Sequence, residues 1–457
     1  MEILLISHAY PPFPASGSRR GESLANAFVR NGHRVTALTA RLPGEAGRWR
    51  THEANLRVVP VGGMITPRHL YLSLRRGRVK KRGARSGYGE RPRAAPSFRD
   101  RGTEESSPTW KRHLLSLLLL PDREQGFILP AVLRGLREAR SGSDILYTTG
   151  PPISTHVAGL LIKRATGVPW VAEFRDPWVV DAVPLKPPQL RSPLGDRIHR
   201  WLYRQCLGAA DRLVAVTAAT ANVLASELPG GVPDRVILAR NGIPEMAPPE
   251  EDHVVVPGPF RIVHLGDFYG PRSPEAFLET VAEIQSGAGG GGLPPLHIEM
   301  VGHSDDARAE AYRRLTARLG IAGVVRFRDW VPFEEGQQLL AGADLLLLIA
   351  QGQPLQVPNK LYEYLGHRKP ILAFADRDGE TAAMLRAAGG HYLITEDHDR
   401  RQAARTVRAA IRGEEHGRLP GETDDVESLL AAWSTRAQLG HLLARLESLG
   451  LTRTASS

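Results

Sequence analysis

Residues 1–40 read MEILLISHAYPPFPASGSRRGESLANAFVRNGHRVTALTA. Within them, Ile3–Ser7 and Val35–Thr39 are short apolar runs of the length of buried strands. Between the two runs, Glu22–Asn31 has the apolar spacing of one helix face, and Gly32 follows where helices commonly stop. The order strand, helix, strand predicts a βαβ unit with two parallel strands.

The same alternation continues along the chain and restarts once, after the Pro-rich and acidic stretch Gly242–Pro259. The first series has further predicted strands at Asp144–Thr148, Pro169–Phe174 and Arg212–Thr217, with helices at 155–166 and 194–207. The second has strands at Arg261–Leu265, Leu296–Val301, Val324–Phe327, Asp344–Ile349 and Pro370–Phe374, with helices near 274–286, 306–319, 360–366 and 379–388. The sequence therefore predicts an α/β fold with two Rossmann-like doubly wound domains and an interdomain cleft.

These series also give the expected domain boundaries. Residues 1–240 are assigned to an N-terminal Rossmann-like domain, 241–260 to a linker and 261–423 to a C-terminal Rossmann-like domain. Residues 424–457 are expected to form a C-terminal helix that packs back on the N-terminal domain.

The charge of the chain is divided unevenly. Residues 1–240 hold 37 Lys and Arg against 19 Asp and Glu, whereas the remaining residues hold 22 against 30. Much of the excess lies in a basic insertion at 68–113, with 14 basic and 4 acidic side chains. Such a segment attracts phosphate groups on a lipid, a nucleic acid or a ligand, and a solvated, mobile insertion is the alternative. Its Phe, Tyr and Trp residues are too scattered to stack bases, so nucleic acid is not an expected partner.

Several function classes lack their sequence signals. The only cysteine, Cys206, leaves no disulfide within the chain, Cys-based zinc site or iron–sulfur cluster, and is typical of a reducing cytosol. The first residues lack the basic region of a signal peptide. The longest apolar run, Leu114–Leu120, which is interrupted only by Ser116, is too short to cross a bilayer. The loop at 8–21 lacks G-x-G-x-x-G, and no P-loop, G-x-S-x-G or H-E-x-x-H motif occurs. Dinucleotide, P-loop, serine-hydrolase and zinc-protease chemistries are therefore not expected.

Residues 357–373, VPNKLYEYLGHRKPILA, are the most specific stretch. Pro358 suits a first helical turn, and a helix start offers N–H groups and a positive dipole end to a diphosphate. Lys360 adds a full positive charge there. Glu363 lies one turn beyond Asn359 on the same face, where its carboxylate can accept two ribose hydroxyls. These parts suit the stabilisation of a departing diphosphate.

This stretch resembles the donor-binding motif of the retaining glycosyltransferases of family four, which have the two-domain GT-B fold. The resemblance extends along nearly the whole chain and depends on the order and spacing of its parts. The family's opening loop and helix resemble Pro11-Pro12 with Gly17 and Arg20, followed by Asn31–Val35. Its turn before the linker resembles Asn241-Gly242-Ile243. The first strand and phosphate loop of its donor domain resemble His264–Phe268 with Arg272. Arg175-Asp176-Pro177-Trp178 resembles a bacterial branch that builds surface polysaccharides, antigens or glycolipids.

The resemblance implies a nucleotide-sugar donor bound mainly by the C-terminal domain and an acceptor bound by the N-terminal domain. Arg272 and Lys360 would hold the diphosphate, and Asn359 and Glu363 the nucleoside. The implied donor-binding residues are Gly17, Gly266, Arg272, Asn359, Lys360 and Glu363; the acceptor-binding residues are Arg20, Arg175 and Asp176; the catalytic residues are Arg175, Asp176, Arg272 and Lys360. Gly17 would let the backbone approach the donor from the opposite domain.

Two positions depart from the family pattern. Asp267 stands where the family has an Arg in its phosphate loop, and Leu355 stands where it has the first of two glutamates. A nucleotide-sugar epimerase of the same fold and a non-catalytic nucleotide-sugar-binding homologue are the alternatives. Leu355 argues against the epimerase, because that chemistry needs carboxylates poised for proton transfer at the sugar.

No cofactor and no metal is expected. Asp376-Arg377-Asp378 has the spacing of a metal–diphosphate site, but a turn with a helix N-cap explains these aspartates better. Trp330 is expected to pack in the core, with stacking on the nucleobase as the alternative. The acceptor is expected to be a lipid-linked or surface-polysaccharide precursor. The enzyme is expected to be cytoplasmic and peripheral on the inner face of the cell membrane, docked on anionic lipid by residues 68–113.

Overall fold

The computed structural model describes residues 1–13, 16–41, 54–64, 66, 117–118, 120–178, 192–228, 230, 233–245, 258–268, 270–286, 292–302, 306–421 and 425–450. The basic insertion at 68–113 and most of Leu114–Leu120 lie outside these residues. The chain divides into an N-terminal unit, Met1–Arg240 with Leu439–Ser457, and a C-terminal unit, Asn241–Gln438.

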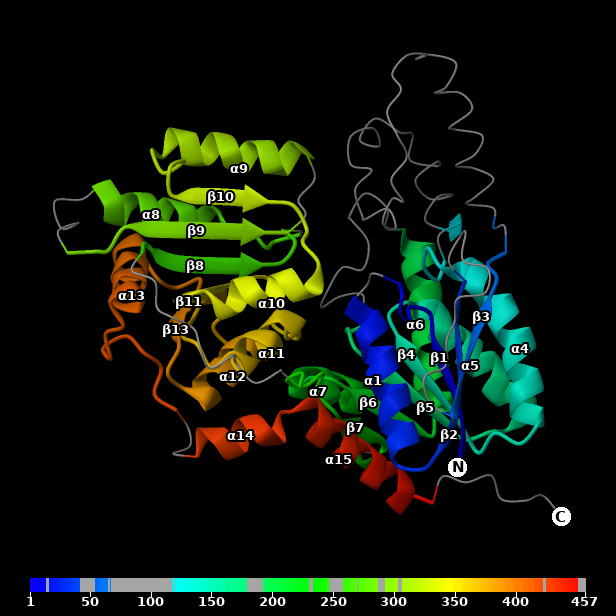
Figure 1. Cartoon of the computed structure of the whole chain (residues 1–457). Helices are drawn as coiled ribbons and strands as arrows, with labels where there is room; N and C mark the ends of the chain where they lie inside the picture. The colour runs from blue at the N-terminus through cyan, green and yellow to red at the C-terminus, as the bar shows by residue number, and fades with distance from the viewer. Residues whose placement is uncertain are drawn as a thin grey trace, which may run out of the picture. The chain divides into compact units, whose positions relative to one another are not determined.

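The described strands of the N-terminal unit form one parallel sheet in the order β3-β2-β1-β4-β5-β6-β7 (Figure 1). The strand order reverses between β1 and β4, as it does in a doubly wound sheet. The strands are β1 Glu2–Ser7, β2 Arg34–Ala40, β3 Leu56–Val61, β4 Ile145–Gly150, β5 Trp170–Phe174, β6 Arg212–Ala215 and β7 Val236–Leu238. The helices are α1 Ser16–Arg30, α4 Ile128–Arg140, α5 Ile153–Thr166, α6 Pro193–Ala209 and α7 Ala218–Glu227, with short 3₁₀ turns η1 Gln125–Phe127 and η3 Pro233–Arg235. The last helix, α15 Thr435–Ser448, belongs to this unit from Leu439 onward.

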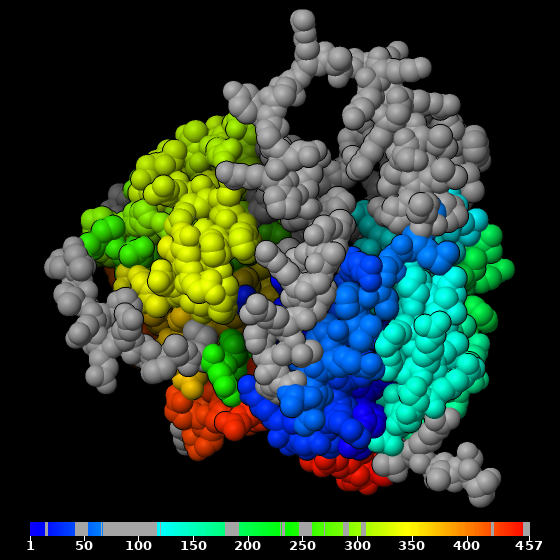
Figure 2. Space-filling model, turned by 45° about the vertical axis from the view of Figure 1, so that its right-hand side comes forward, coloured from blue at the N-terminus to red at the C-terminus, as the bar shows by residue number. Residues whose placement is uncertain are grey.

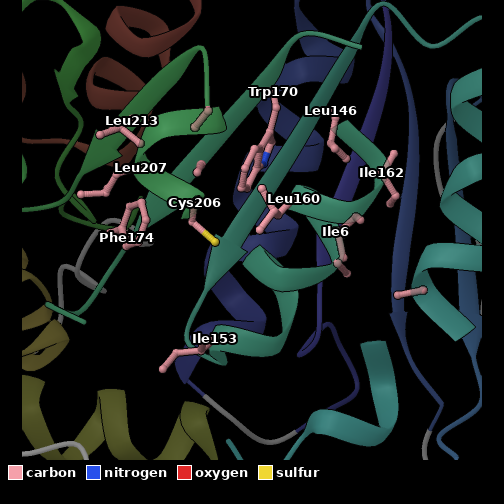
Figure 3. Packing of buried hydrophobic residues seen from close by; sticks show 14 of the residues in the cluster. Ile6, Leu146, Ile153, Leu160, Ile162, Trp170, Phe174, Cys206, Leu207 and Leu213 are labelled. Carbon is pink, nitrogen blue, oxygen red and sulfur yellow. The ribbon is translucent and has the colours of Figure 1, made fainter. Parts of the chain in front are cut away.

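Two layers of helices bury the two faces of this sheet. Trp170 of β5 is fully buried in a cluster with Leu160 of α5 and Cys206 of α6 (Figure 3). Burial raises the pKa of the Cys206 thiol, as expected for an unreactive side chain in the core. On the other face, Phe28 of α1 and Leu442 of α15 pack on the sheet. The alternation of side chains along each strand supplies both clusters.

The first helix begins earlier than the sequence predicted. α1 spans Ser16–Arg30, so Gly17 and Arg20 belong to its first turns, and the prediction of a loop there was wrong. Gly and Ser are weak helix formers, but tertiary packing overrides that propensity. A Cβ on Gly21 would lie 2.5 Å from Ser7 Oγ, so glycine allows α1 to approach β1 closely.

The described strands of the C-terminal unit form a second parallel sheet in the order β10-β9-β8-β11-β12-β13 (Figure 1). Here the order reverses between β8 and β11. The strands are β8 Phe260–Leu265, β9 Leu296–Val301, β10 Val325–Arg328, β11 Leu345–Ala350, β12 Ile371–Ala375 and β13 Tyr392–Ile394. The helices are α8 Glu275–Ser286, α9 Asp306–Arg318, α10 Phe333–Ala341, α11 Asn359–Gly366, α12 Glu380–Ala388, α13 Arg400–Arg412 and α14 Val426–Ala432.

The predicted fold class is therefore confirmed: both sheets are parallel and doubly wound. Most predicted elements fall within one or two residues of the observed ones. Within the described ranges, no helix combines the length and the apolar character needed to cross a bilayer.

Candidate active site

Parallel strands bring the loops that follow β1, β4 and β5 to one edge of the N-terminal sheet. Arg175 and Asp176 follow β5 directly, and α1 and α5 both begin at this edge. The carboxyl edge at the reversal of strand order is where open α/β sheets bind ligands. The predicted residues of the N-terminal unit are therefore all placed at this edge.

Arg175 lies over the start of α1. Its backbone N–H donates to the Gly150 carbonyl at 2.9 Å, and its guanidinium donates to the carbonyl of Pro151. A Cβ on Gly17 would lie 2.5 Å from Arg175 Nη1, so glycine leaves the space that the guanidinium occupies. Burial lowers the pKa of Arg175, and the charges of Asp176 and Glu173 oppose that shift. Arg175 Nε is buried with no hydrogen-bond partner among the described residues.

Arg20 holds α1 to two strands through buried bonds. Its Nε donates to Glu173 Oε1 at 2.8 Å, and its two other nitrogens donate to the carbonyls of Ala239 and Arg240 at 3.1 Å. The other oxygen of Glu173 accepts from the Tyr147 hydroxyl at 2.5 Å. These bonds give Arg20 a structural role, and a contact with an acceptor stays a prediction.

Sequence reasoning assigned no role to Glu173 or Tyr147. A glutamate inside the apolar strand WVAEF was the available signal, because Glu is almost never fully buried without a partner. Burial and the neighbouring Glu173 charge raise the pKa of Tyr147 well above its usual value, so the phenol stays protonated and donates.

Two more titratable residues at this edge were not singled out. Asp122 accepts from the Ser154 N–H at 2.8 Å and from the Ser154 hydroxyl at 2.6 Å, which fixes the start of α5. Burial raises the pKa of Asp122. Burial lowers the pKa of His8 to about 4, against the charge of Asp122, so this imidazole is neutral near pH 7.

In the C-terminal unit the backbone pairing between β8 and β11 stops early. The paired residues are Leu345 with Ile262 and Leu346 with Val263. Beyond them, side chains make the links. His264 Nδ1 lies 2.9 Å from the Leu347 carbonyl, and the Tyr364 hydroxyl of α11 accepts from the Leu265 N–H at 2.8 Å. The strands are thus joined by side chains at the point where the strand order reverses.

His264 is a buried imidazole that the sequence analysis left without a role. It is 4% exposed and stacks on Phe268, with ring centroids 4.8 Å apart. Its pKa is lowered to about 4, mainly by burial. The hydrogen bond to Leu347 opposes this shift, and the charges of Lys360 and Arg272 contribute to it. A neutral ring that donates from Nδ1 to a carbonyl has an accepting lone pair on Nε2. His264 Nε2 has no hydrogen-bond partner among the described residues.

Hydrogen bonds link the loop after β8 to the loop after β11, and the loop after β11 to the loop after β12. The Arg272 guanidinium donates to the side-chain oxygen of Gln353. The N–H groups of Gly352 and Gln353 each donate to the Asp376 carboxylate at 2.7 Å. Asp376 therefore holds the loop after β11, whereas the N-cap of α12 is Gly379. The prediction that these aspartates cap a helix was wrong.

Helix α11 carries three predicted residues in its first two turns. Its cap is Pro358, whose side chain offers no acceptor to the first N–H groups. The Asn359 side-chain oxygen accepts from Asn241 Nδ2 at 2.7 Å, which fixes the orientation of that amide. Lys360 Nζ lies 3.4 Å from Glu363 Oε2, and Glu363 is 7% exposed. The helix thus pairs a half-exposed cation with a buried carboxylate.

The remaining predicted residues lie on the loops around this helix. Gly266 follows β8 with φ of 151°. Its carbonyl oxygen lies against Gly302, and a Cβ on Gly302 would lie only 2.0 Å from that oxygen. Asp267, which replaces the family's Arg, is exposed. Trp330 follows β10 and is 68% exposed, so the prediction of core packing was wrong. The strand that precedes Trp330, β10, is the edge strand of the described sheet.

A separate hollow of about 850 Å³ lies in the C-terminal unit between α8, α13 and the ends of β11–β13. Glu279, Glu283, Asp376, Glu396 and His398 are among its lining residues. None of the predicted site residues lines it. Among the described residues, no group of three or more His, Cys, Asp or Glu is placed to hold a metal ion.

The buried His264 makes a prediction for stability. Its pKa is about 4 in the folded chain and 6.5 in an unfolded chain, so only the unfolded state takes up its proton between those values. Folded-state stability from this group is therefore complete above pH 6.5 and is lost as pH falls to about 4. At 1.36 kcal/mol for each pKa unit, the loss is roughly 3 kcal/mol.

His264→Gln removes this titrating group. The fall in melting temperature between neutral and mildly acidic buffer should be smaller in the variant than in the parent chain, whatever the absolute stability of the variant. His416→Gln changes an exposed histidine and serves as the control. Equal acid sensitivity of His264→Gln and the parent chain would contradict the buried, neutral assignment.

Comparisons with known proteins agree with this arrangement. Residues 17–242 match the model of the family described as Glycosyl transferase 4-like domain. Sucrose-phosphate synthase from Thermosynechococcus elongatus has a similar structure, with a TM-score of 0.66, 14% identity and coverage of 98% of this chain and 100% of that one. HepE from Anabaena, solved with UDP, gives 0.60 and 14%, and the lipopolysaccharide outer core galactosyltransferase WaaB gives 0.58 and 12%, each with the same coverage.

No curated protein sequence matches the chain. At 12–14% identity, the solved structures establish the fold, and the family match over residues 17–242 establishes the kind of protein. The matched range includes Gly17, Arg20, Arg175 and Asp176. Residues 17–242 therefore belong to the glycosyl transferase 4-like family, and the chain is a glycosyltransferase with two Rossmann-like units in the GT-B fold.

Proposed function

We propose that this glycosyltransferase moves a sugar from a nucleotide diphosphate sugar to a lipid-linked or surface-polysaccharide precursor, with retention of the anomeric configuration and without a metal ion. The observation that carries the donor part of the proposal is the start of α11, with Lys360 beside the buried Glu363. HepE, which shares the fold, was solved with UDP and with UDP-glucose, which supports uridine nucleotides as the first donors to test.

In the proposed donor site, positive charge gathers where the diphosphate leaves. Lys360 and Arg272 both lie close enough to His264 to lower its pKa, so their charges converge on the end of β8. The first N–H groups of α11 add the positive end of the helix dipole. Fixed positive groups stabilise the charge that develops on the leaving diphosphate, which lowers the barrier to transfer. Exposed Trp330 is available to stack on a nucleobase.

Glu363 would bind the ribose of the donor. Its carboxylate is buried, and a buried carboxylate hydrogen-bonds strongly to hydroxyl groups that replace its water. Asn359, whose orientation is fixed by Asn241, would hold the neighbouring part of the nucleoside. Gly266 would let the backbone approach the phosphates.

In the proposed acceptor site, Arg175 and Asp176 would orient the acceptor hydroxyl at the carboxyl end of β5. Arg175 is held by two carbonyls and by the space above Gly17, so its charge is fixed in place. A half-buried guanidinium attracts phosphate or the hydroxyl that becomes the nucleophile. The bonds of Arg20 to Glu173 would keep α1, and with it Gly17, in position.

The proposed function is tested by measuring released nucleotide diphosphate with a panel of UDP-, GDP- and dTDP-sugars, with and without extracted membrane lipid. We expect one donor class to turn over faster when lipid is present, and the rate to survive EDTA. Lys360→Ala, assayed in parallel, shows that the release comes from this site. A rate that EDTA abolishes and Mg²⁺ or Mn²⁺ restores would contradict the metal-free part.

The roles of Glu363 and Lys360 predict different kinetic effects. Glu363→Gln removes charge from hydrogen bonds worth roughly 1.5–3 kcal/mol, so donor affinity should fall about tenfold or more with folding unchanged. Lys360→Ala should reduce kcat more than Glu363→Gln does, because charge on the leaving group grows toward the transition state. Glu310→Gln, at an exposed position of α9, is the control. Unchanged donor affinity in Glu363→Gln would assign Glu363 to structure alone.

Gly17→Ala tests the acceptor half. The new Cβ would push the end of the Arg175 side chain out of the place that its two carbonyl contacts and Gly17 define, so turnover should fall at least about tenfold. The melting temperature should change little, because the displaced atoms are the end of one long side chain and not backbone. Gly208→Ala in α6 is a matched control, since a Cβ there meets nothing within 4 Å. Full activity of Gly17→Ala would show that the position of Arg175 does not matter for transfer.

A further inference from the structure

The outer side of the N-terminal unit concentrates exposed apolar side chains on three helices. α4, α5 and α6 cover the same face of the sheet, and the Arg164 guanidinium of α5 donates to Gln205 of α6. Figure 2 shows α4, in cyan, at the surface of the molecule. The exposed large apolar residues on these helices, between 43% and 55% exposed, are Leu129, Leu133, Leu161, Leu194 and Trp201.

Arginines accompany these apolar residues. Six arginines are exposed on the same helices: Arg137, Arg140, Arg164, Arg197, Arg200 and Arg204. Among the described residues of α4, α5 and α6, no exposed position is acidic. The two acidic residues of these helices, Glu138 and Asp196, are half-buried, and Glu138 is bound by Arg57 and Arg134. We call the outward side of α4–α6, with these eleven exposed residues, the helical face.

The helical face is not a random sample of the surface. In the described part of the chain, the other exposed large apolar residues are Met64, Trp330 and Phe333, and none of these lies on a helix of the N-terminal unit. Single exposed leucines are ordinary on a protein surface. A cluster of exposed apolar side chains surrounded by polar residues is typical of an interaction site. Helices packed side by side are 8–10 Å apart, so three of them present a surface about 20 Å across.

The chemistry of the helical face fits one kind of partner. Tryptophan prefers the boundary between lipid headgroups and acyl chains, leucine enters the chains, and arginine keeps its charge at the phosphates while its stem lies along apolar surface. An excess of positive charge attracts an anionic leaflet. A nucleic acid would also attract arginines, but leucines offer no stacking surface to bases and the face has one aromatic residue.

We propose that the helical face docks the N-terminal unit on an anionic lipid bilayer, with Trp201 and the leucines at the headgroup boundary and the arginines at lipid phosphates. The contact lies at the surface of the bilayer, and no part of the helical face crosses the bilayer. This docking proposal rests on the proposed function. A docked enzyme would meet a lipid-linked acceptor at the membrane surface to which it is bound. The docking is independent of residues 68–113, because the helical face contains none of them.

The test uses the full chain and vesicles of phosphatidylcholine alone or mixed with phosphatidylglycerol, at low and high salt. We expect flotation with the anionic vesicles only, weakened by salt. The double variant Arg197→Glu, Arg204→Glu should bind at least about tenfold more weakly. The control double variant Arg30→Glu, Arg313→Glu makes the same charge change at exposed positions outside the helical face and should bind as the parent chain does.

A second readout examines Trp201 directly. Brominated lipid chains should quench tryptophan fluorescence of the bound chain, and Trp201→Phe should lose much of that quenching while still floating. The proposal would be overturned if the two double variants bound vesicles equally, or if flotation did not depend on lipid charge. It would also be overturned if a single-stranded oligonucleotide bound more tightly than the vesicles and Arg197→Glu, Arg204→Glu abolished that binding. Nucleotide release with a water-soluble acceptor should be unchanged in Arg197→Glu, Arg204→Glu, which separates failure to dock from failure of the proposed reaction.

Discussion

A buried carboxylate in the middle of β5 constrains the whole N-terminal unit. Glu173 has no exposed surface, and leaving its charge unpaired there would cost several kcal/mol. Arg20 and Tyr147 satisfy both of its oxygens, and Arg20 in turn binds the carbonyls that follow β7. The first turns of α1 are thereby fixed against two strands. The position of Gly17 under Arg175, and so the shape of the carboxyl edge, depends on this bond network.

Much of the fold could be predicted from the sequence because buried parallel strands are short apolar runs. Several of the elements that escaped prediction lack such a signal. β7 and β13 are three residues long, and β3 contains Pro60. Helix α13, RRQAARTVRAAIR, carries arginines outside and buries mainly alanines, so it has few large apolar residues to indicate a buried face. The start of α1 was missed because glycine and serine occur where packing, not propensity, makes the helix.

In the candidate site, too, some contacts follow from the local sequence and others depend on the fold. Lys360 and Glu363 are three residues apart, so their meeting on one helix face follows from spacing, and their 3.4 Å contact agrees with it. Gly17 and Arg175 are far apart in sequence, and only the folded sheet brings them together. His264 and Trp330 show the limit most clearly. Their burial and exposure depend on which strand is central and which is at the edge, which no local pattern records.

The early end of the backbone pairing between β8 and β11 has a consequence for how such a site diversifies. A ladder of backbone bonds is the same for every sequence, whereas the links made by His264 and Tyr364 change when those side chains change. Substitutions at two positions can therefore reshape the ligand-facing end of the sheet while the paired part of the strands stays intact. The geometry of this end of the sheet thus depends on two side chains, whereas the geometry of the paired part depends on the backbone alone, so the two parts can change independently.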